Sequence, residues 1–306
     1  MTQLTFISLL TQMSGFLFGT DDQQLISLFS TWLIVMTVVV LVCFIVSEIT
    51  RNYSQVDKLW SLMPIVYCLL TFTAMNQSPR IWVMTFLVIL WGFRLTYNFN
   101  RKGGYNLVFW RGEEDYRWNY LRQHTILRNQ LKFSIFNFLF ISFYQHLLIL
   151  LFTTPILLAA KYWNEPLNWL DYVAGALMLL FIGIESIADN QQFRFQQMKR
   201  GKIKNTGQFG NSLKNGFLHE GIWKYARHPN FAAEQMIWVS FYLFSVAASG
   251  QWLNWTASGA VLLILLFIGS STLTENISKS KYPAYADYQE NVARFVPGFR
   301  RFAVRR

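Results

Sequence analysis

The chain has 306 residues, of which 53% are hydrophobic, 18% are aromatic and only 14% are charged, and its formal net charge is +11. A soluble globular protein of this length would carry more charge, so the composition excludes that class and favours a membrane protein. Cys43 and Cys68 both fall in apolar runs, so the sequence indicates no disulfide framework.

The first 24 residues predict an interfacial segment rather than a spanning helix. The apolar stretch 5–18 is shorter than the ~20 residues that a bilayer requires, and it leads directly to Asp21 and Asp22. It also lacks the basic start of a secretory signal peptide. We therefore expect residues 1–24 to lie at the membrane surface or to precede the first helix.

Beyond this segment the hydropathy pattern predicts an all-α fold in which seven helices span the membrane within one domain, residues 1–306. The predicted helices cover residues 25–48, 59–76, 80–99, 133–158, 168–190, 231–249 and 253–273. Pro64 predicts a kink in the second of them. The helical bundle would thus occupy residues 25–273, and residues 274–306 would form a cytoplasmic tail.

The distribution of Lys and Arg predicts the orientation. With the N-terminus outside and the C-terminus in the cytoplasm, nearly all of them fall in inner loops, Lys58 included, and the outer loops keep only Arg80 and Lys161. This asymmetry is the one that the positive-inside rule demands. Together with binding to anionic membrane lipids, it explains the positive charge without a nucleic-acid partner.

Polar residues inside or at the ends of the predicted helices are the first candidates for a site. Arg94, at the inner end of the third helix, is either a snorkelling anchor or a partner for phosphate or carboxylate. Gln145 and His146 fall near the middle of the fourth helix, where such a pair either lines a cavity or ties helices together.

The fifth helix carries acids near its inner end. Glu185, Asp189 and Gln192 are spaced by four and three residues, which places them on one helix face. Acids within membrane helices are costly and usually face a cavity, so they indicate a functional site. The alternative is a salt bridge with a loop cation such as Arg194.

The polar stretch Gly221–Glu234 reads GIWKYARHPNFAAE and leads into the sixth helix. Pro229 stops any helix that arrives from the N-terminal side, and Asn230 is a good N-cap for the next one. The free N–H groups of that helix would point toward Arg227 and His228, as in sites for phosphate or carboxylate. The alternative is an interfacial loop in which Arg and His meet lipid headgroups.

The seventh helix approaches the tail at Glu275. Three tyrosines follow at a spacing of three residues: Tyr282, Tyr285 and Tyr288. This stripe predicts amphipathic packing against the membrane surface rather than a stacking platform. His124 and His219 lie in polar loops and are expected to be solvated. The sequence contains no GxGxxG motif after a strand, no P-loop and no zinc-type Cys/His spacing, which excludes a soluble nucleotide-binding fold and predicts no metal site.

Several of these stretches together resemble the steroid 5α-reductase C-terminal domain family, most closely its bacterial multi-pass relatives. The match covers most of residues 55–300. It is carried by Val56–Tyr67, Leu90–Leu95, Phe143–Pro155, Ile184–Gln196, Gly221–Glu234 and the tail KYPAYADYQENVARFVP. Phe231 and Ala233 stand where the family usually has Tyr and Gly. The Arg-His-Pro-Asn stretch is shared with sterol C=C reductases and with isoprenylcysteine carboxyl methyltransferases, but the acid-bearing helix end before it favours the reductases.

The resemblance implies an NADPH site at the inner ends of the helices. By matched position, the residues around the cofactor would be Arg94, Glu185, Asp189, Arg227, His228, Asn230, Glu234 and Tyr282. Arg94, Arg227 and the helix start at Asn230 would suit the pyrophosphate. Glu185 and Asp189 would accept from ribose hydroxyls or the nicotinamide amide, and basic residues of the loop 194–204 would meet the 2′-phosphate.

The chain departs from the family at the substrate. Steroid 5α-reductases carry a Gln-Glu pair on the second helix and a Tyr on the third that engage the substrate. The corresponding places here read Ser61, Leu62, Met63 and Trp91. Another group must therefore polarise the hydride acceptor, and the candidates are Tyr67, Tyr97, Gln145 and His146.

These features predict a membrane-embedded NADPH-dependent reductase of a C=C bond in a lipid-like substrate of the sterol, isoprenoid or enoyl type. A bacterial inner membrane is favoured over the endoplasmic reticulum, and no protein partner can be inferred. One alternative is an S-adenosylmethionine-dependent methyltransferase, although such enzymes usually show a Glu-Glu pair where this chain has Thr274 and Glu275. The other is a non-catalytic protein that retains the fold, which would explain the missing Gln-Glu-Tyr set.

Overall fold

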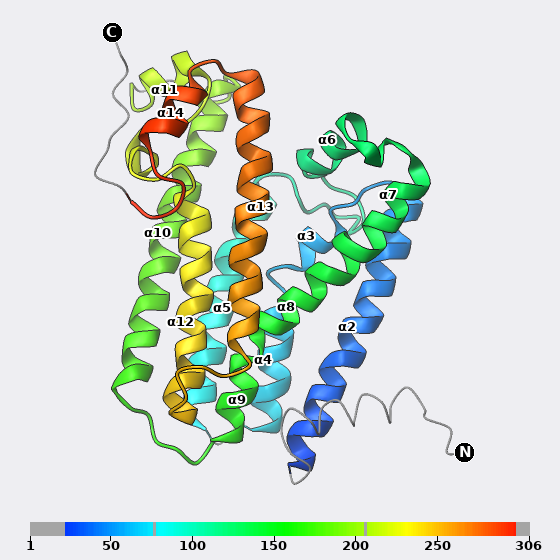
Figure 1. Ribbon diagram of the computed structural model, residues 1–306, viewed down its shortest axis with the longest axis vertical. Coiled ribbons are helices and arrows are strands. Elements are labelled where there is room, and N and C mark those ends of the chain that lie inside the picture. Colours follow the sequence, from blue (N-terminus) through cyan, green and yellow to red (C-terminus); the bar gives the residue numbers. More distant parts are fainter. Residues whose placement is uncertain (1–21, 76–77, 205–206, 298–306) are drawn as a thin grey trace. The chain divides into compact units, whose positions relative to one another are not determined.

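The computed structural model describes residues 22–75, 78–204 and 207–297, and every regular element within them is a helix (Figure 1). Seven helical stretches in these ranges are long and apolar enough to span a membrane. They are Gln23–Thr50, Gln55–Ala74, Pro79–Arg101, Gln130–Lys161, Trp169–Lys199, Pro229–Ser249 and Ala257–Lys281. The predicted all-α, multi-pass membrane fold is confirmed. The predicted interfacial segment lies, up to residue 21, outside the described residues.

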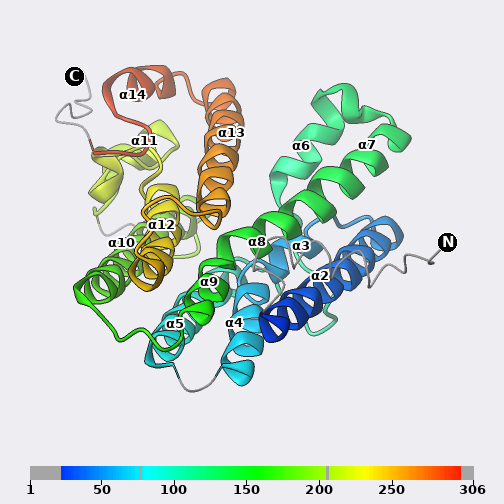
Figure 2. The same cartoon turned by 60° about the horizontal axis from the view of Figure 1, so that its bottom comes forward.

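Five of these stretches are single helices: α2 (Gln23–Thr50), α5 (Pro79–Arg101), α10 (Trp169–Lys199), α12 (Pro229–Ser249) and α13 (Ala257–Lys281). The fourth stretch joins α7 (Gln130–Phe136), the π-helix η2 (Asn137–Tyr144), α8 (Gln145–Thr153) and α9 (Pro155–Lys161). Shorter elements connect them: α6 (Tyr116–His124), η1 (Ile126–Arg128), α11 (Gly210–Asn215), η3 (Gly221–Lys224) and α14 (Tyr285–Asn291). Figure 2 shows α6 and α7 as a hairpin closed by η1.

The second stretch is broken where the sequence predicted a kink. Helix α3 (Gln55–Leu59) ends before α4 (Met63–Ala74), and Pro64 lies in the first turn of α4. Proline is tolerated there because its missing N–H would have no partner within the helix in any case.

Two helices extend about two turns or more beyond their predicted C-terminal ends. Helix α10 continues to Lys199 and α13 to Lys281, so Gln192 and Glu275 lie on helices rather than beside loops. The stretch 274–281 contains no Gly or Pro, and the helix ends directly before Tyr282, whose helical conformation is disfavoured by Pro283. The predicted tail therefore begins about two turns later than residue 274.

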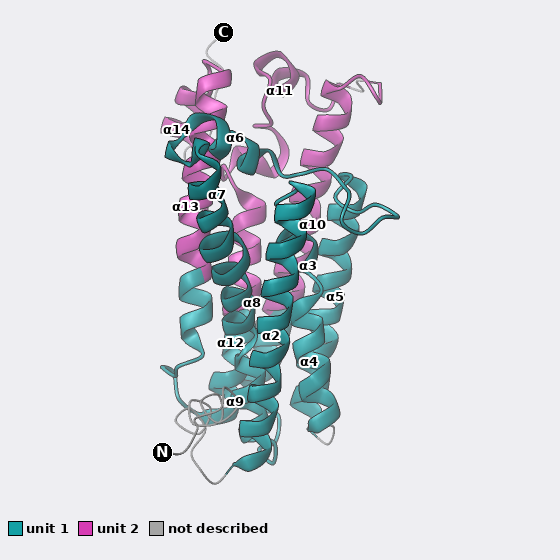
Figure 3. Ribbon diagram, turned by 90° about the vertical axis from the view of Figure 1, so that its right-hand side faces the viewer, with its two compact units in different colours: residues 1–176, 240–262 teal, residues 177–239, 263–306 magenta. Residues whose placement is uncertain are grey.

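The chain divides into two compact units (Figure 3). The first unit comprises residues 1–176 and 240–262, and the second comprises residues 177–239 and 263–306. Helices α10, α12 and α13 contribute residues to both units. The predicted candidate residues consequently fall into two groups, and each group is described within its own unit.

In the first unit, a glycine brings α4 and α5 close together. A Cβ on Gly92 would lie 2.6 Å from Ile65 Cδ1 and 2.8 Å from the Ser61 carbonyl oxygen, so only glycine allows this approach. The hydroxyls of Ser61 and Thr96 are 2.7 Å apart beside it. Ser61 and Trp91, which occupy places that engage substrate in the 5α-reductase pattern, therefore take part in helix packing.

Lys58 is fully buried rather than solvated in an inner loop. Its Nζ donates to the carbonyls of Phe109 and Arg111, each at 2.8 Å, and to Gln55 Oε1 at 3.1 Å. The Tyr105 hydroxyl donates back to the Lys58 carbonyl. These bonds fasten the loop after α5 to α3, and they satisfy an ammonium group that would otherwise be costly to bury.

Arg80, predicted as an outer-loop cation, is also buried. Its Nε and Nη2 donate to Asp171 Oδ1 and Oδ2 at 2.7 and 2.9 Å, and further donors meet the carbonyls of Glu165 and Pro166. The prediction of orientation treated Arg80 only as an outer-loop cation. Counting charges does not show that Arg80 pairs with Asp171, which lies 91 residues away in the sequence. The bidentate pair joins the start of α5 to the start of α10.

We predict that Asp171→Ala destabilises the protein by about 3–5 kcal/mol, because it leaves the Arg80 guanidinium buried without its counter-charge. Thermal unfolding of the detergent-solubilised protein measures the effect. The double change Arg80→Met with Asp171→Leu should recover most of the loss, since both charges are then absent. If the Asp171→Ala variant unfolds at the same temperature as the native protein, the assignment is contradicted.

Candidate functional site

The stretch Gly221–Lys224 of the second unit is held against α10. Ile222 donates its backbone N–H to Gln191 Oε1 at 3.0 Å, and Trp223 Nε1 donates to the Ala188 carbonyl at 3.3 Å. Gly221 has a φ of +68°, and a Cβ there would lie 2.2 Å from Gln191 Oε1. Glycine is therefore required at this turn, and the turn brings the following Arg-His-Pro-Asn residues to the C-terminal half of α10.

Helix α12 begins at Pro229, two residues earlier than predicted. Proline suits the first helical position because its φ is preset and its missing N–H costs nothing there. Asn230 is therefore a helical residue and not the N-cap. Its side chain instead donates from Nδ2 to Asp189 Oδ1 on α10 at 3.3 Å.

Arg227 is tied to α13 and to the tail. Its Nε and Nη2 donate to the two carboxylate oxygens of Glu275 at 2.7 and 3.3 Å. Its Nη1 donates to the carbonyls of Gln289 and Val292. All three guanidinium nitrogens thus have protein partners, and the side chain is 8% exposed. This geometry does not support the predicted role of Arg227 at a pyrophosphate.

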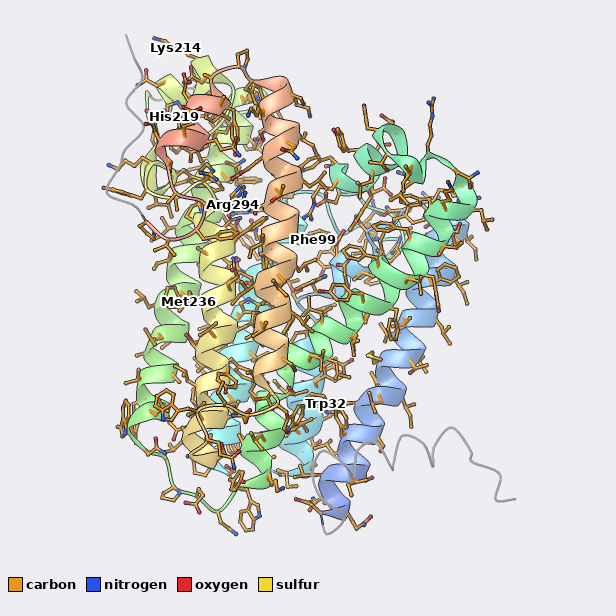
Figure 4. All side chains as sticks on the ribbon, in the orientation of Figure 1. Trp32, Phe99, Lys214, His219, Met236 and Arg294 are labelled. Carbon is orange, nitrogen blue, oxygen red and sulfur yellow. The ribbon has the colours of Figure 1, made fainter. Side chains whose placement is uncertain are left out.

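The backbone continues the same contact. The N–H groups of Arg227 and His228 donate to the carbonyls of Ala293 and Arg294 at 2.9 and 3.0 Å. Figure 4 shows Arg294 with His219 at the end of this unit that contains α11 and α14. The tail therefore closes over the start of α12.

Glu275 is the centre of this network. Besides Arg227, it accepts from His228 Nε2 at 2.9 Å and from Gln289 Nε2 at 2.8 Å, and Arg294 Nη2 lies 3.5 Å away. Burial lowers the pKa of His228, although the hydrogen bond to Glu275 acts in the opposite direction. The ring of His228 stacks on Phe231, with centroids 5.3 Å apart.

Next to this network lies a cluster of buried hydrogen-bond acceptors. Glu185, Asp189 and Glu234 are each at most 5% exposed. Trp238 Nε1 donates to Glu234 Oε1 at 3.0 Å within α12, and Asn230 binds Asp189 as described. Asp189 is not held by the alternative salt bridge to Arg194. Its carboxylate accepts a hydrogen bond from the Asn230 amide, and Arg194 is exposed.

Two acceptor atoms of this region have no hydrogen-bond partner within the described part of the chain. They are Asn230 Oδ1 and Gln192 Oε1, and both are buried. Gln192 follows Asp189 by three residues on α10, so the two side chains share a helix face. Buried acceptors of this kind are rare in native structures, which marks the region as a candidate binding site for a group that donates hydrogen bonds.

Tyr282, the last predicted cofactor residue of this unit, binds a lysine. Lys199 Nζ donates to the Tyr282 hydroxyl at 2.7 Å and to the Gly216 carbonyl at 2.6 Å. The tyrosine stripe was predicted to pack against the membrane surface, but Tyr285 and Tyr288 are instead buried against Phe217 within the protein. Tyr282 thus lies beside the basic end of α10, within reach of an anion there.

His219 is buried rather than solvated, contrary to the prediction. It is 4% exposed, its Nε2 accepts from Asn215 Nδ2 at 3.0 Å, and its ring lies against Phe217 and Tyr288. Burial lowers the pKa of His219. The polar loop concealed this because Phe217 and Leu218 direct the segment into the interior. His124 is exposed, as predicted.

In the first unit, Gln145 and His146 tie helices together. Gln145 Oε1 accepts from Trp60 Nε1 at 2.9 Å. His146 Nδ1 lies 2.6 Å from the Ser142 carbonyl and must donate to it, so Nε2 accepts the weak hydrogen bond of Cys43 Sγ at 3.9 Å. The two predicted alternatives were that the pair lines a cavity or that it links helices, and the structure shows that it links helices.

The remaining candidates of the first unit differ in exposure. Tyr97 is 65% exposed and its ring lies beside Arg101, so it does not face the interior of this unit. Arg94 is half-buried on α5. Tyr67 is fully buried, it stacks on Trp32, and its hydroxyl has no hydrogen-bond partner among the described residues. Among the four predicted acceptor-activating residues, Tyr67 has the unused buried hydroxyl.

Comparison with known proteins places this arrangement in a family. Residues 43–292 match the family described as "Protein of unknown function (DUF1295)". The chain belongs to this DUF1295 family. An uncharacterized protein of Schizosaccharomyces pombe is 39% identical over 264 residues, which is 82% of this chain and 74% of that protein. No solved structure matches.

The DUF1295 match ends at Val292, the residue whose carbonyl accepts from Arg227, so it contains most of the Glu275 network. Reasoning from the sequence missed Gln289 and Arg294 as partners of Glu275. Both lie in the tail stretch that carries the resemblance, but α14 ends between them at Asn291. No helical spacing therefore relates the two residues.

We predict that Glu275→Ala in this DUF1295 protein lowers stability by about 3–5 kcal/mol, because Arg227 then remains buried without its counter-charge. Limited proteolysis should release the tail beyond Tyr282 faster than in the native protein. Replacement of the exposed Arg194 by Ala is the matched control and should change neither measurement. A protected tail in Glu275→Ala would contradict the role given to this carboxylate.

We predict that stability falls as the pH drops below about 6.5, the ordinary pKa of histidine. Because burial lowers the pKa of His219 and of His228, the unfolded chain binds more protons below that pH, and stability rises with pH through this window. Thermal unfolding between pH 5 and pH 8, as an approximate range, measures the slope. His219→Gln should reduce the slope, whereas His124→Gln, at an exposed position, should preserve it.

Proposed function

We propose that the chain is a membrane-embedded, NADPH-dependent reductase that acts on a C=C bond of an apolar lipid of the sterol, isoprenoid or enoyl type. The observation that carries this proposal is the buried acceptor cluster of the second unit. The resemblance of the same stretches to the steroid 5α-reductase C-terminal domain family supports it. The residues 43–292 that match the DUF1295 family include this whole cluster.

The cluster fits the polar part of a nicotinamide nucleotide. The carboxamide and the ribose hydroxyls donate hydrogen bonds, and Asn230 Oδ1 and Gln192 Oε1 are buried acceptors with no partner within the described ranges. Asp189, held in place by Asn230 Nδ2, would accept from a ribose hydroxyl or the amide. Glu185 would accept beside it, since it lies one turn earlier on the same face of α10.

The phosphates would be held by lysines of the loop 194–204, already expected at the 2′-phosphate, and not by Arg227. Arg227 already has Glu275 and the tail carbonyls as partners. Lys202 and Lys204 are exposed beyond the end of α10, and Lys199 lies beside the Tyr282 hydroxyl. These lysines would meet the pyrophosphate and the 2′-phosphate as point charges.

When bound, NADPH supplies the hydride. The chain contributes the position and the surroundings of the cofactor. The carboxylates of Glu185, Asp189 and Glu234 are at most 5% exposed, so water has little access to them, and a hydrogen bond to a carboxylate is stronger there than in water. The network around Glu275 holds the start of α12 in place, and with it Asn230 and its bond to Asp189.

A second candidate is an S-adenosylmethionine-dependent lipid methyltransferase. It is favoured by two features of the same cluster, which contains three buried carboxylates and no free guanidinium at Arg227. Carboxylates suit the ammonium and sulfonium groups of that cofactor, which needs no phosphate clamp.

A titration of the purified full-length protein with NADPH, and separately with S-adenosylmethionine, tests both candidates. We predict that NADPH binds and that Asp189→Asn weakens it about tenfold or more, because a hydrogen bond to a charged acceptor is lost. Asp287→Asn, at an exposed position on α14, is the matched control and should bind NADPH as the native protein does.

Tight binding of S-adenosylmethionine alone would replace the first candidate by the second. Binding of neither would contradict both and support a non-catalytic membrane protein. Consumption of NADPH in the presence of an enone sterol or an isoprenoid enone then measures the reduction itself.

A further inference from the structure

A second set of buried polar groups lies in the first unit, away from the cytoplasmic loops. Trp32 Nε1 on α2, Tyr67 Oη on α4 and Thr85 Oγ1 on α5 are all buried, and none has a hydrogen-bond partner among the residues that the structure describes. Trp32 and Tyr67 are fully buried and Thr85 is 4% exposed. Figure 4 shows Trp32 near the Gln23 end of α2.

The three groups lie at a common level of the unit. Gln24 Nε2 donates to the Ala74 carbonyl at 2.9 Å, which places the start of α2 beside the end of α4. At 1.5 Å per residue, Trp32 is about 12 Å from Gln24 and Tyr67 is about 10 Å from Ala74. Thr85 is about 9 Å from the start of α5 at Pro79, which follows the last residue of α4 by five positions.

Two of the groups are in direct contact. The rings of Trp32 and Tyr67 are stacked, with centroids 4.6 Å apart and an interplanar angle of 28°. Thr85 is buried at the same level on α5, the helix that packs against α4 at Gly92. The stacking fixes both rings, so their N–H and O–H groups cannot turn away to the surface.

Each of these groups can donate a hydrogen bond, and the indole N–H can only donate. A buried donor without a partner costs about 1–3 kcal/mol, and an apolar membrane interior offers no substitute. Elsewhere in this unit, buried polar groups such as Lys58, Arg80 and Gln145 have protein partners. Three donors at one level therefore call for an acceptor from outside the chain.

The ligand reaches this level from the bilayer. Leu69 and Phe86, close in sequence to Tyr67 and Thr85, are 41% and 63% exposed, so α4 and α5 each present another face to lipid at this level. Ile34 on α2 is 40% exposed in the same way. An apolar molecule with one buried oxygen matches such an approach.

We propose that Trp32, Tyr67 and Thr85 form a binding site for the carbonyl oxygen of an apolar, lipid-like molecule. A carbonyl oxygen accepts through two lone pairs and brings no further hydrogen that needs an acceptor. This inference is independent of the reduction proposed above, because binding of the oxygen requires neither cofactor nor hydride transfer.

The test compares two probes with one skeleton, cholest-4-en-3-one and cholest-4-ene, which differ by the carbonyl oxygen. Their affinities for the detergent-purified full-length protein are measured by competition with a tritiated sterol ketone. The ketone should bind about tenfold more tightly than the hydrocarbon, and Tyr67→Phe and Trp32→Phe should each remove most of that difference.

Matched controls use exposed residues of the same types. Tyr172→Phe and Trp82→Phe, at positions 68% and 57% exposed, should keep the native preference for the ketone. Unfolding without ligand provides the second measurement. Tyr67→Phe should be at least as stable as the native protein, because it removes a buried hydroxyl that has no partner.

Two results would overturn the proposal. One is equal affinity of the native protein for ketone and hydrocarbon, as expected if the donors bind only water. The other is a clear loss of stability in ligand-free Tyr67→Phe, which would show that the hydroxyl has a partner within the chain.

Discussion

The second unit depends on the carboxylate of Glu275. This group accepts hydrogen bonds from Arg227 and His228 before α12 and from Gln289 in α14, and Arg294 lies beside it. A carboxylate buried among apolar helices is costly unless such donors surround it. The requirement therefore fixes one arrangement of α13, the start of α12 and the tail. Because Arg227 also donates to tail carbonyls, charged groups act together with the apolar cluster of Phe217, Tyr285 and Tyr288 to hold the tail over the helix ends.

The need to pair buried charges also distinguishes two kinds of residue at the candidate site. Some residues hold the site together, and others would face a ligand. Every guanidinium nitrogen of Arg227 has a protein partner, so its contacts hold α13, the start of α12 and the tail together. Asn230 is placed by the turn at Pro229, and its amide spans the distance to Asp189. The Asn230 side chain still has one acceptor, Oδ1, that is unused by the described residues. An unused acceptor favours binding of the part of a nucleotide that donates hydrogen bonds. Anionic groups would have to meet the lysines at the end of α10.

The first unit contains buried polar groups with hydrogen-bond partners and others without a partner within the described ranges. Lys58 and Arg80 are buried with several hydrogen bonds each, and they join segments that are far apart in the chain. Gln145 and His146 do the same within the helical stack. Trp32, Tyr67 and Thr85 differ because their polar atoms meet no such partner within the described ranges. That contrast, and not burial alone, distinguishes a site for a ligand from the polar contacts that hold the helices together.

The sequence by itself determined the class of this protein and the number of its spanning helices, because a bilayer requires long apolar runs whose length can be counted. It also determined that Glu185, Asp189 and Gln192 share one helix face, since helical spacing is local. Only the tertiary structure decided what the charged residues do. Arg80 and Lys58 looked like topology signals and Arg227 like a phosphate ligand, yet each is buried against partners 48 to 91 residues away. Spacing along one helix does not show such partners, because they are brought together by the packing of separate helices.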